Sequence, residues 1–276
     1  MIIYPRITII TPTYNRATLL ERAIISVINQ RYDNLEFIII DGASTDGTFD
    51  LLNKYDEKIS KWISEPDTGP IYAIKKGYEL ATGDYIYFLS SDDYLEPGIL
   101  NNIGNILYRE YCDVLHGDFI YYDNINAATF LCKPWFTSNN DIYINRYQWP
   151  SVFLNTFFVK KSIYDSFIKD INSLYVPAVD YEIFQMLLDR NVFFKYYDNV
   201  IVHANTGGIS DNAMKGYFQV AKISINHGCG RISAINALIK KVVIRKAAII
   251  LTRIGLAHMR DKFLVKYSKN IVKLPI

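Results

Sequence analysis

The first hundred residues alternate short apolar runs with helical patterns, and this alternation limits the fold more than any other feature of the chain. Apolar runs at residues 7–10, 35–40 and 85–89 have the length of buried strands, and residues 62–64 form a shorter one. Residues 18–28 and 70–81 repeat apolar side chains with helical spacing. Strands that alternate with helices of this length form βαβ units and a parallel sheet. The sequence therefore predicts an α/β fold in which helices flank a mainly parallel sheet. In the second half, residues 151–159 are predicted as a strand and residues 180–188 as a helix.

Polar clusters follow successive predicted strands, at the strand ends where parallel sheets bind ligands. They are, in chain order, residues 11–16 (TPTYNR), 41–47 (DGASTDG), 65–69 (EPDTG) and 90–93 (SSDD). Backbone amides of the first cluster, together with Arg16, could hold an anion. Taken alone, residues 11–16 or 90–93 are first interpreted as a solvated turn, so the prediction of a site depends on the ordered spacing of the clusters.

Two adjacent carboxylates, Asp92 and Asp93, come directly after the predicted strand at residues 85–89. A divalent cation relieves the repulsion between such neighbours, and hard oxygen ligands favour Mg²⁺ or Mn²⁺ over zinc. An ion held by one or two protein carboxylates keeps positions open for a diphosphate. The alternative is a solvated turn that caps the next helix.

The net charge of +2 is the sum of two unlike parts. Residues 231–276 carry 11 Lys or Arg and one acid, Asp261, for a charge of +10. The other 230 residues carry 19 basic and 27 acidic side chains, for −8. Residues 237–253 form a basic amphipathic pattern that suits an anionic membrane surface. The alternatives are that this helix packs on the body of the protein or on a second subunit, as in a homodimer.

Cysteine spacing and the N-terminus indicate the compartment. Cys112, Cys132 and Cys229 are odd in number and widely spaced, which favours reduced thiols in the cytosol. The N-terminus lacks the order of a signal peptide, and no window of about 18 residues is apolar and uncharged. We expect a cytoplasmic protein, peripheral at the inner face of the cell membrane, without a nucleic-acid partner.

As an ordered set, these clusters resemble family-2 nucleotide-sugar glycosyltransferases of the GT-A fold. Residues 26–30 (SVINQ) and 76–84 (KGYELATGD) add to the resemblance, which is dense over residues 6–100 and thinner to about residue 210. It implies transfer of a sugar, with inversion, from a nucleoside diphosphate donor to a hydroxyl of a glycan or lipid-linked glycan. A UDP-sugar is the first choice of donor. It also implies a divalent metal, Mn²⁺ or Mg²⁺, and a role in making bacterial surface polysaccharide.

The resemblance, together with the change in charge near residue 230, assigns domains, and the resemblance assigns binding residues. Residues 1–230 would form the GT-A domain, with a nucleotide-sugar-binding half (1–100) and an acceptor half (101–230), and residues 231–276 a basic helical tail. Asp41 is expected at the base or ribose, Asp92 as the metal ligand, and Asp93 as a second or supporting carboxylate. The residues expected to bind the nucleotide sugar are Thr11, Pro12, Tyr14, Asn15, Asp41, Ser44, Asp67 and Ser91.

The sequence departs from the family pattern at two places. Ser90 stands where the metal motif often begins with an acid. Residues 72–75 (YAIK) stand where relatives often have Asp-Ala-x-Asn.

An inverting displacement needs a base that removes the proton of the acceptor hydroxyl. Asp180 matches the acid that opens a helix in the second half of similar enzymes, and a helix N-terminus stabilises its carboxylate. Glu182 ranks second, since residues two apart do not share a helix face. The alternative is that Asp180 only caps the helix.

Three further positions come from the second half of the chain. Trp149 could stack on an acceptor sugar or pack in the core. Residues 207–210 (GGIS) resemble the family's turn that covers the diphosphate. His203 lies just before this turn, and as a lone histidine it is interpreted as structural.

Two other functions compete with glycosyl transfer. A non-catalytic nucleotide-sugar-binding partner subunit is supported by Ser90 alone. A nucleotidyltransferase is disfavoured, because residues 11–16 lack the glycines that commonly hold a triphosphate.

Overall fold

The computed structural model describes residues 4–123, 128–134, 137–147, 154–205, 213–253 and 271–274. The strands are β1 (Ile7–Thr13), β2 (Leu35–Asp41), β3 (Lys61–Ser64), β4 (Tyr85–Phe88), β5 (Tyr94–Leu95), β6 (Val114–Asp123), β7 (Ala128–Cys132), β8 (Phe158–Lys160), β9 (Phe194–Asn205) and β10 (Ile271–Lys273). The α-helices are α1 (Ala17–Ile28), α2 (Thr48–Lys54), α3 (Pro70–Leu80), α4 (Ile99–Arg109), α5 (Asn139–Ile144), α6 (Lys161–Asp165), α7 (Val179–Asp189), α8 (Ala213–Asn226) and α9 (Arg231–Arg253). The 3₁₀ helices are η1 (Asp56–Lys58), η2 (Leu154–Thr156), η3 (Ile168–Asp170) and η4 (Ser173–Ala178).

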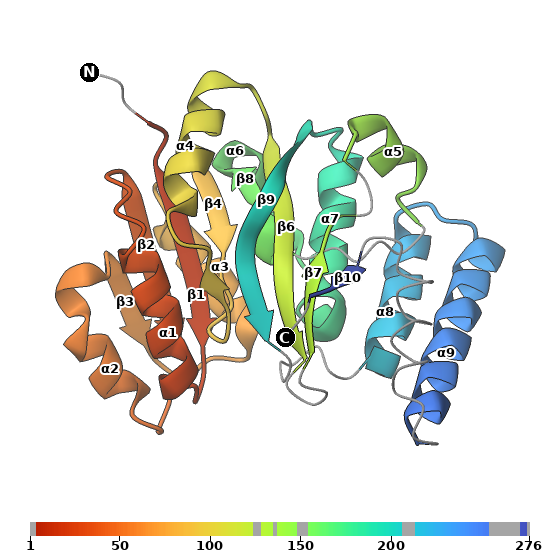
Figure 1. Cartoon of the computed structure of the whole chain (residues 1–276), viewed down its shortest axis with the longest axis horizontal. Coiled ribbons are helices and arrows are strands. Elements are labelled where there is room, and N and C mark those ends of the chain that lie inside the picture. The colour runs from red at the N-terminus through yellow and green to blue at the C-terminus, as the bar shows by residue number, and fades with distance from the viewer. Residues whose placement is uncertain are drawn as a thin grey trace.

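The strands form one mixed sheet in the order β10-β7-β6-β8-β4-β1-β2-β3, with β9 paired to β5 and β6. Strands β1 to β4 run parallel to one another, which confirms the predicted parallel half. Beyond β4 the strands mix directions, because β8 pairs antiparallel with both β4 and β6. Figure 1 shows helices on both faces of this sheet, so the predicted α/β class is confirmed.

The register of the parallel half brings its carboxyl ends into one row. Thr13 at the end of β1 pairs with Asp41 of β2, and Asp41 pairs with Ser64 of β3. The polar clusters that follow these strands therefore start side by side at one edge of the sheet. This is the edge at which parallel sheets bind ligands.

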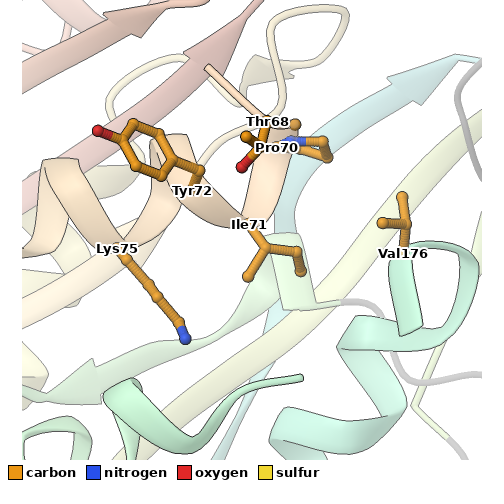
Figure 2. A pocket seen from close by; sticks show the side chains of 7 residues that line it. Thr68, Pro70, Ile71, Tyr72, Lys75 and Val176 are labelled. Atoms are coloured by element: carbon orange, nitrogen blue, oxygen red, sulfur yellow. The ribbon is translucent and has the colours of Figure 1, made fainter. Parts of the chain in front are cut away.

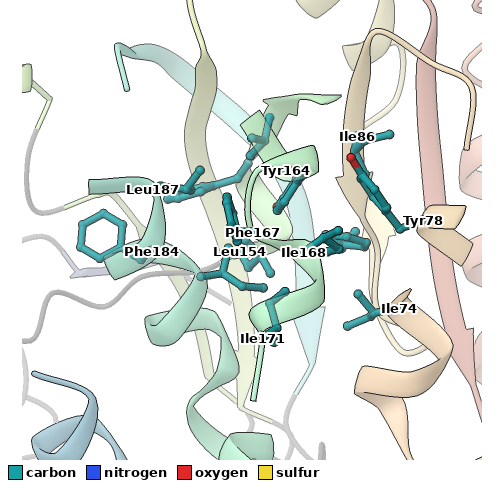
Figure 3. Close-up of a cluster of buried hydrophobic side chains, with 14 of the residues drawn as sticks. Ile74, Tyr78, Ile86, Leu154, Tyr164, Phe167, Ile168, Ile171, Phe184 and Leu187 are labelled. Carbon is teal, nitrogen blue, oxygen red and sulfur yellow. The ribbon is translucent and has the colours of Figure 1, made fainter. Parts of the chain in front are cut away.

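Alternate residues of the parallel strands point to opposite faces of the sheet and enter two hydrophobic cores. Ile9, Phe37 and Tyr87 face one core, which α1, α2 and α4 cover. Ile10 and Ile38 face the other core, which α3, α6, α7 and α8 cover. Figure 3 shows part of this second core, where side chains of α3, α6 and α7 meet. Burial on both faces explains why the strands read as continuous apolar runs.

The second half differs from the sequence prediction at residues 151–159. This apolar run predicts a single strand, but of its described residues only Phe158 and Val159 belong to a strand, β8, and Leu154–Thr156 forms the 3₁₀ helix η2. The predicted helix at 180–188 is confirmed as α7. Helix α9 begins next to the boundary predicted at residue 230 and packs against α8.

A glycine sets the distance between α3 and the sheet. A Cβ placed on Gly77 would overlap Cγ2 of Ile10 and lie 3.3 Å from Cγ1 of Ile40. Helix α3 therefore lies directly on β1 and β2, and its N-terminus is held over the carboxyl edge of the sheet.

Replacing Gly77 with alanine should lower the free energy of unfolding by about 1–3 kcal/mol, because the core is already filled there. Gly216 of α8 is the matched control, since its Cβ would lie 3.7 Å from the Pro177 carbonyl oxygen, an ordinary contact. Gly216→Ala should stabilise the protein by up to about 1 kcal/mol through helix propensity. Urea unfolding measures both variants, and a Gly77→Ala protein as stable as Gly216→Ala would contradict this account.

Candidate active site

The loops after β1 and β2 are bound to each other. The Asn15 N–H donates to Ser44 Oγ at 2.7 Å, and the Thr45 N–H donates to Asn15 Oδ1 at 2.8 Å. Asn15 and Ala43 have positive φ angles of 50° and 62°, so both loops turn sharply at these contacts. Two of the predicted nucleotide-binding residues, Asn15 and Ser44, are thus in direct contact.

Asp41 lies at the centre of this arrangement and is fully buried. Its Oδ2 accepts hydrogen bonds from the Ser64 hydroxyl at 2.6 Å and the Ser44 N–H at 3.0 Å, and Oδ1 accepts one from the Ser44 hydroxyl. The carboxylate therefore joins the ends of β2 and β3 to the Ser44 loop. That Asp41 contacts a base or ribose stays a prediction, and the structure adds this positioning role.

Asp46 supplies the helix caps at this edge. Its carboxylate accepts the Ala17 N–H at 2.9 Å and both the hydroxyl and the N–H of Thr48, at 2.6 and 3.2 Å, so it caps α1 and α2 together. The spacing of Thr18 and Glu21 predicts a capping box for α1, and this prediction is wrong. Helix α1 begins at Ala17 without a side-chain cap of its own, and Glu21 pairs instead with Lys54 of α2.

Tyr14 and Asp67 flank Gly42 across the same edge. A Cβ on Gly42 would lie 3.1 Å from Asp67 Oδ2 and 3.3 Å from Tyr14 Cδ2. The Tyr14 ring is 62% exposed, and Asp67 Oδ1 accepts the Gly69 N–H at 2.7 Å at the start of α3. An exposed aromatic ring beside a carboxylate suits a flat, polar ligand such as a nucleoside.

The remaining predicted nucleotide-binding residues lie deeper. Thr11 is fully buried in β1, Pro12 pairs in register with Ile40, and Ser91 is buried in the turn after β4. The hydroxyls of Thr11 and Thr13 are buried, and within the described ranges they have no hydrogen-bond partner.

Asp92 is the accessible member of the acidic pair. Its side chain is 14% exposed, and its Oδ2 accepts a hydrogen bond from Arg16 at 2.8 Å in an ion pair. Its backbone carbonyl accepts from Arg22 at 3.0 Å and from the Asn205 amide at 2.6 Å. The β1 loop, α1 and the end of β9 thus all hold the turn that presents this carboxylate.

Asp93 is buried and is held by the protein. The Asn155 side-chain amide donates to Asp93 Oδ2 and, at 3.0 Å, to Ser90 Oγ, while the Asn205 N–H lies 3.3 Å from Asp93 Oδ1. Burial, with the nearby Asp92 charge, raises the pKa of Asp93 to about 8. These contacts favour the supporting role for Asp93 and leave Asp92 as the carboxylate that can reach a ligand.

Asp180 lies in the first turn of α7 and is joined to the acidic turn through η2. Burial raises the pKa of Asp180 to about 6, against the lowering effect of a hydrogen bond from the Leu154 N–H. The next residue, Asn155, holds Asp93 and Ser90. Two consecutive residues of one 3₁₀ turn therefore bond to the predicted base and to the predicted metal-binding turn.

Glu182, the second candidate for the base, is buried and points elsewhere. Its Oε2 accepts the Asn172 N–H at 3.0 Å, and burial raises its pKa to about 7. The charge of Lys75 acts against this rise. Lys75 itself donates to the carbonyls of Lys169 and Ile171 at 2.8 and 3.0 Å, so it ties α3 to the segment that precedes α7. Lys75, which stands where the family pattern often has Asn, therefore stabilises the packing of α3 against residues 169–171.

A pocket of about 210 Å³ lies between the start of α3 and η4 (Figure 2). Its first lining residue, Thr68, directly follows Asp67 in the sequence. Tyr72 is 44% exposed, and its ring is large enough to stack on a sugar. The pocket is lined by Thr68, Gly69, Pro70, Ile71, Tyr72, Lys75 and Val176.

The carboxylates fit a metal bound through a single protein ligand. Asp92 offers one partly exposed carboxylate, and Mg²⁺ is often bound through one or two carboxylates together with substrate phosphates. Among the described residues, no group of three or more His, Cys, Asp or Glu side chains could hold a metal without such a substrate.

Sequence reasoning missed two of the residues that shape this site, Asn155 and Asn205. A polar Asn155 inside an apolar run is a weak signal, and only the folded chain shows that it meets Asp93. His203 is structural, as interpreted, because it stacks on Tyr94 at 4.5 Å and bonds to Tyr122 and Glu96. Trp149 and residues 207–210 lie outside the described residues.

Comparison with known proteins identifies the family. The family model "Glycosyl transferase family 2" matches residues 8–164, more than half of the chain. The chain belongs to glycosyl transferase family 2. It is therefore a nucleotide-sugar-dependent glycosyltransferase of an inverting family, and the enzyme is favoured over a non-catalytic binder.

Bacterial relatives extend this glycosyltransferase assignment beyond the matched segment. An uncharacterised glycosyltransferase of Haemophilus influenzae is 27% identical over 237 residues, which are 80% of this chain and 91% of the relative. The GalNAc(5)-diNAcBac-PP-undecaprenol β-1,3-glucosyltransferase of Campylobacter jejuni is 28% identical over 235 residues, 80% of this chain and 75% of the relative. The relatives also include enzymes of polysaccharide biosynthesis.

Solved structures confirm the GT-A fold of this glycosyltransferase. TarS of S. aureus with UDP-GlcNAc matches with a TM-score of 0.61 and 16% identity, over 84% of this chain and 70% of TarS. The mannosyltransferase PcManGT of Pyrobaculum calidifontis, in complex with GDP-Man and Mn²⁺, matches with a TM-score of 0.59 and 17% identity, over 97% and 87% of the two chains. In the described part of the chain, none of the helices is long and apolar enough to cross a membrane.

Replacing Ser64 with alanine removes one of the hydrogen bonds that hold the fully buried Asp41 carboxylate. A buried acceptor left short of a partner costs about 1–3 kcal/mol, so the free energy of unfolding should fall by that amount. Ser233→Ala, at an exposed position of α9, is the matched control and should change it by less than about 0.5 kcal/mol. Equal urea midpoints for the two variants would show that Asp41 does not depend on Ser64.

Proposed function

We propose that this glycosyltransferase binds a UDP-sugar at the carboxyl edge of strands β1 to β4 and transfers the sugar, with inversion, to a hydroxyl of a glycan or lipid-linked glycan. The observation that carries the proposal is the joining of Asp180 and the Asp92–Asp93 turn through η2. An inverting transfer needs a base near the acceptor and a positive group near the diphosphate, and this turn supports both.

The donor part of the proposal depends on the loops after β1 and β2. Tyr14, Asn15 and Asp67 surround Gly42 and the Ser44 loop, at the strand ends where nucleotides bind in open α/β sheets. A nucleoside can lie on the exposed Tyr14 ring, while Asp41 keeps Ser44 in place below it. Of the solved relatives, TarS is in complex with UDP or UDP-GlcNAc and PcManGT with GDP-Man, and the choice of UDP is part of our proposal.

For the diphosphate, Asp92 is the proposed metal ligand and Asp93 its support. A bound Mn²⁺ or Mg²⁺ would neutralise the charge of the leaving nucleoside diphosphate. Arg16 pairs with Asp92, which keeps the carboxylate oriented and adds positive charge where the diphosphate would lie.

For the acceptor, Asp180 is the proposed base. Its pKa of about 6 keeps it mostly ionised at neutral pH, so the carboxylate can accept the proton of an attacking hydroxyl. Glu182 is the weaker candidate in our account because its carboxylate bonds to the Asn172 N–H, whereas that of Asp180 bonds to η2, next to the residue that holds Asp93. The C. jejuni relative is named for an undecaprenol-linked substrate, and a lipid-linked acceptor at the cytoplasmic face of the membrane is our proposal for this enzyme.

Asp180→Asn should lower kcat by about 10²- to 10⁴-fold, because the acceptor hydroxyl loses its base, while UDP binding stays within about twofold. In the unmodified enzyme kcat should rise as the pH rises through about 6, where the Asp180 carboxylate loses its proton. Transfer assays with UDP-sugars and calorimetric titration with UDP measure the two quantities.

The control for this substitution is Asp170→Asn, which changes an exposed acid of η3 and should leave kcat unchanged. Near-normal transfer by the Asp180→Asn enzyme would remove Asp180 from the role of base. So would a pH profile that is flat between 5 and 7.

A pair of variants separates the metal role of Asp92 from its ion pair. Asp92→Asn should abolish Mn²⁺ binding in the presence of UDP and lower transfer at least about 10²-fold, since it removes the proposed metal ligand. Arg16→Gln breaks the same ion pair but keeps the carboxylate, so Mn²⁺ should still bind. Calorimetry with Mn²⁺ and UDP gives the answer, and equal Mn²⁺ binding by Asp92→Asn and the unmodified enzyme would contradict the assignment.

A further inference from the structure

Helix α9 has two apolar faces, and among the described residues only one of them packs on the rest of the protein. Ala234 and Ala248 are buried, and Ala237 and Leu238 pack against the core next to α8. Apolar side chains of the opposite face are 50–77% exposed: Ile232, Ile235, Ile239, Val243 and Ile250, which we call the outer stripe. The inner face packs on the body of the protein, which is one of the alternatives for this helix. That packing does not explain why the residues of the outer stripe are apolar.

The outer stripe runs along most of the helix. Its residues are spaced at three, four, four and seven positions, so they lie in one line on a helix of 3.6 residues per turn. Helix α9 has 23 residues, which corresponds to a length of roughly 35 Å. Figure 1 shows α9 beside α8 at the end of the molecule away from β1, β2 and β3, so this face is directed away from the sheet.

Positive charge surrounds the outer stripe. Arg231, Lys240 and Lys246 are exposed, and Lys246 lies in line with the stripe between Val243 and Ile250. Residues 231–253 contain no Asp or Glu. A long lysine can keep its ammonium in water while its carbon chain lies on an apolar surface. The face is therefore an apolar line with a cationic border.

We propose that the outer stripe of α9 docks the enzyme on an anionic lipid bilayer, with the helix axis parallel to the membrane plane. Isoleucine and valine side chains would enter the boundary between headgroups and acyl chains, and the arginine and lysine side chains would meet lipid phosphates. This inference concerns where the enzyme works and does not depend on the residues proposed for the chemistry.

Three occupants could cover the outer stripe: a bilayer, a second copy of this chain, or residues 254–270. Charge favours the bilayer. In a second copy docked through the same face, the cations of two α9 helices would meet without an acid between them. Residues 254–270 of this chain carry four Lys or Arg and one Asp, so they would also bring positive charge to a positive face. An anionic lipid surface supplies the missing negative charge together with an apolar layer.

The test measures binding of the full chain to vesicles. The unmodified protein should float with vesicles that contain phosphatidylglycerol and should not float with pure phosphatidylcholine. Raising the salt from 0.15 M to 1 M should weaken the binding because it screens the charges. The double variant Ile239→Asn/Val243→Asn should lower the partition constant between vesicles and water by at least about tenfold. Two apolar side chains that would be buried in the bilayer are replaced by polar ones.

Ile144→Asn is the matched control, since Ile144 is 70% exposed on α5, and this variant should bind vesicles like the unmodified protein. Any of four results would overturn the proposal. Three are no binding to anionic vesicles, unchanged binding by the double variant, and a homodimer that the double variant dissociates in size-exclusion chromatography with light scattering. A large loss of folding stability in the double variant would mean that the chain itself covers the stripe, which would also overturn it.

Discussion

The hydrogen bonds of a single 3₁₀ turn, η2, connect the two halves of this enzyme. The Leu154 N–H bonds to the carboxylate of Asp180, and the side chain of the next residue, Asn155, bonds to Asp93 and Ser90. A shift of this turn would move Asp180, the proposed base, and the acidic turn together. The parallel half of the sheet provides the proposed nucleotide-binding edge, and the position of Asp180 relative to that edge depends on these contacts.

Charge is distributed in the site so that each carboxylate has a different environment. Asp41 is fully buried and bonded to serine hydroxyls, which makes it a structural anchor. Asp93 is buried beside Asp92, and its raised pKa reflects that burial and the neighbouring charge. Asp92 keeps a partly exposed carboxylate that faces Arg16. We propose that these three aspartates serve as structural anchor, support and metal ligand because burial and hydrogen-bond donors differ among them.

The parallel half of the fold and most of the nucleotide edge are predictable from the sequence, because apolar periodicity and the clusters at strand ends are local signals. The second half is less predictable. Residues 151–159 form a mainly apolar run, yet the part at Leu154–Thr156 forms η2, where Asn155 contacts Asp93, a residue 62 positions away. The capping box at Thr18 fails for a similar reason, since Asp46 from another loop already holds the first turn of α1. Helix α9 reads as amphipathic, but only packing shows which apolar face stays exposed.

The structure of the protein with UDP and Mn²⁺ tests the central claim most directly. Anomalous scattering at the manganese edge locates the ion independently of the nucleotide. The account predicts one manganese peak between the Asp92 carboxylate and the diphosphate, with uracil against Tyr14 and the Asp180 carboxylate facing the open side of the diphosphate. A nucleotide bound away from the carboxyl edge of β1 and β2, or an ion without contact to Asp92, would contradict it.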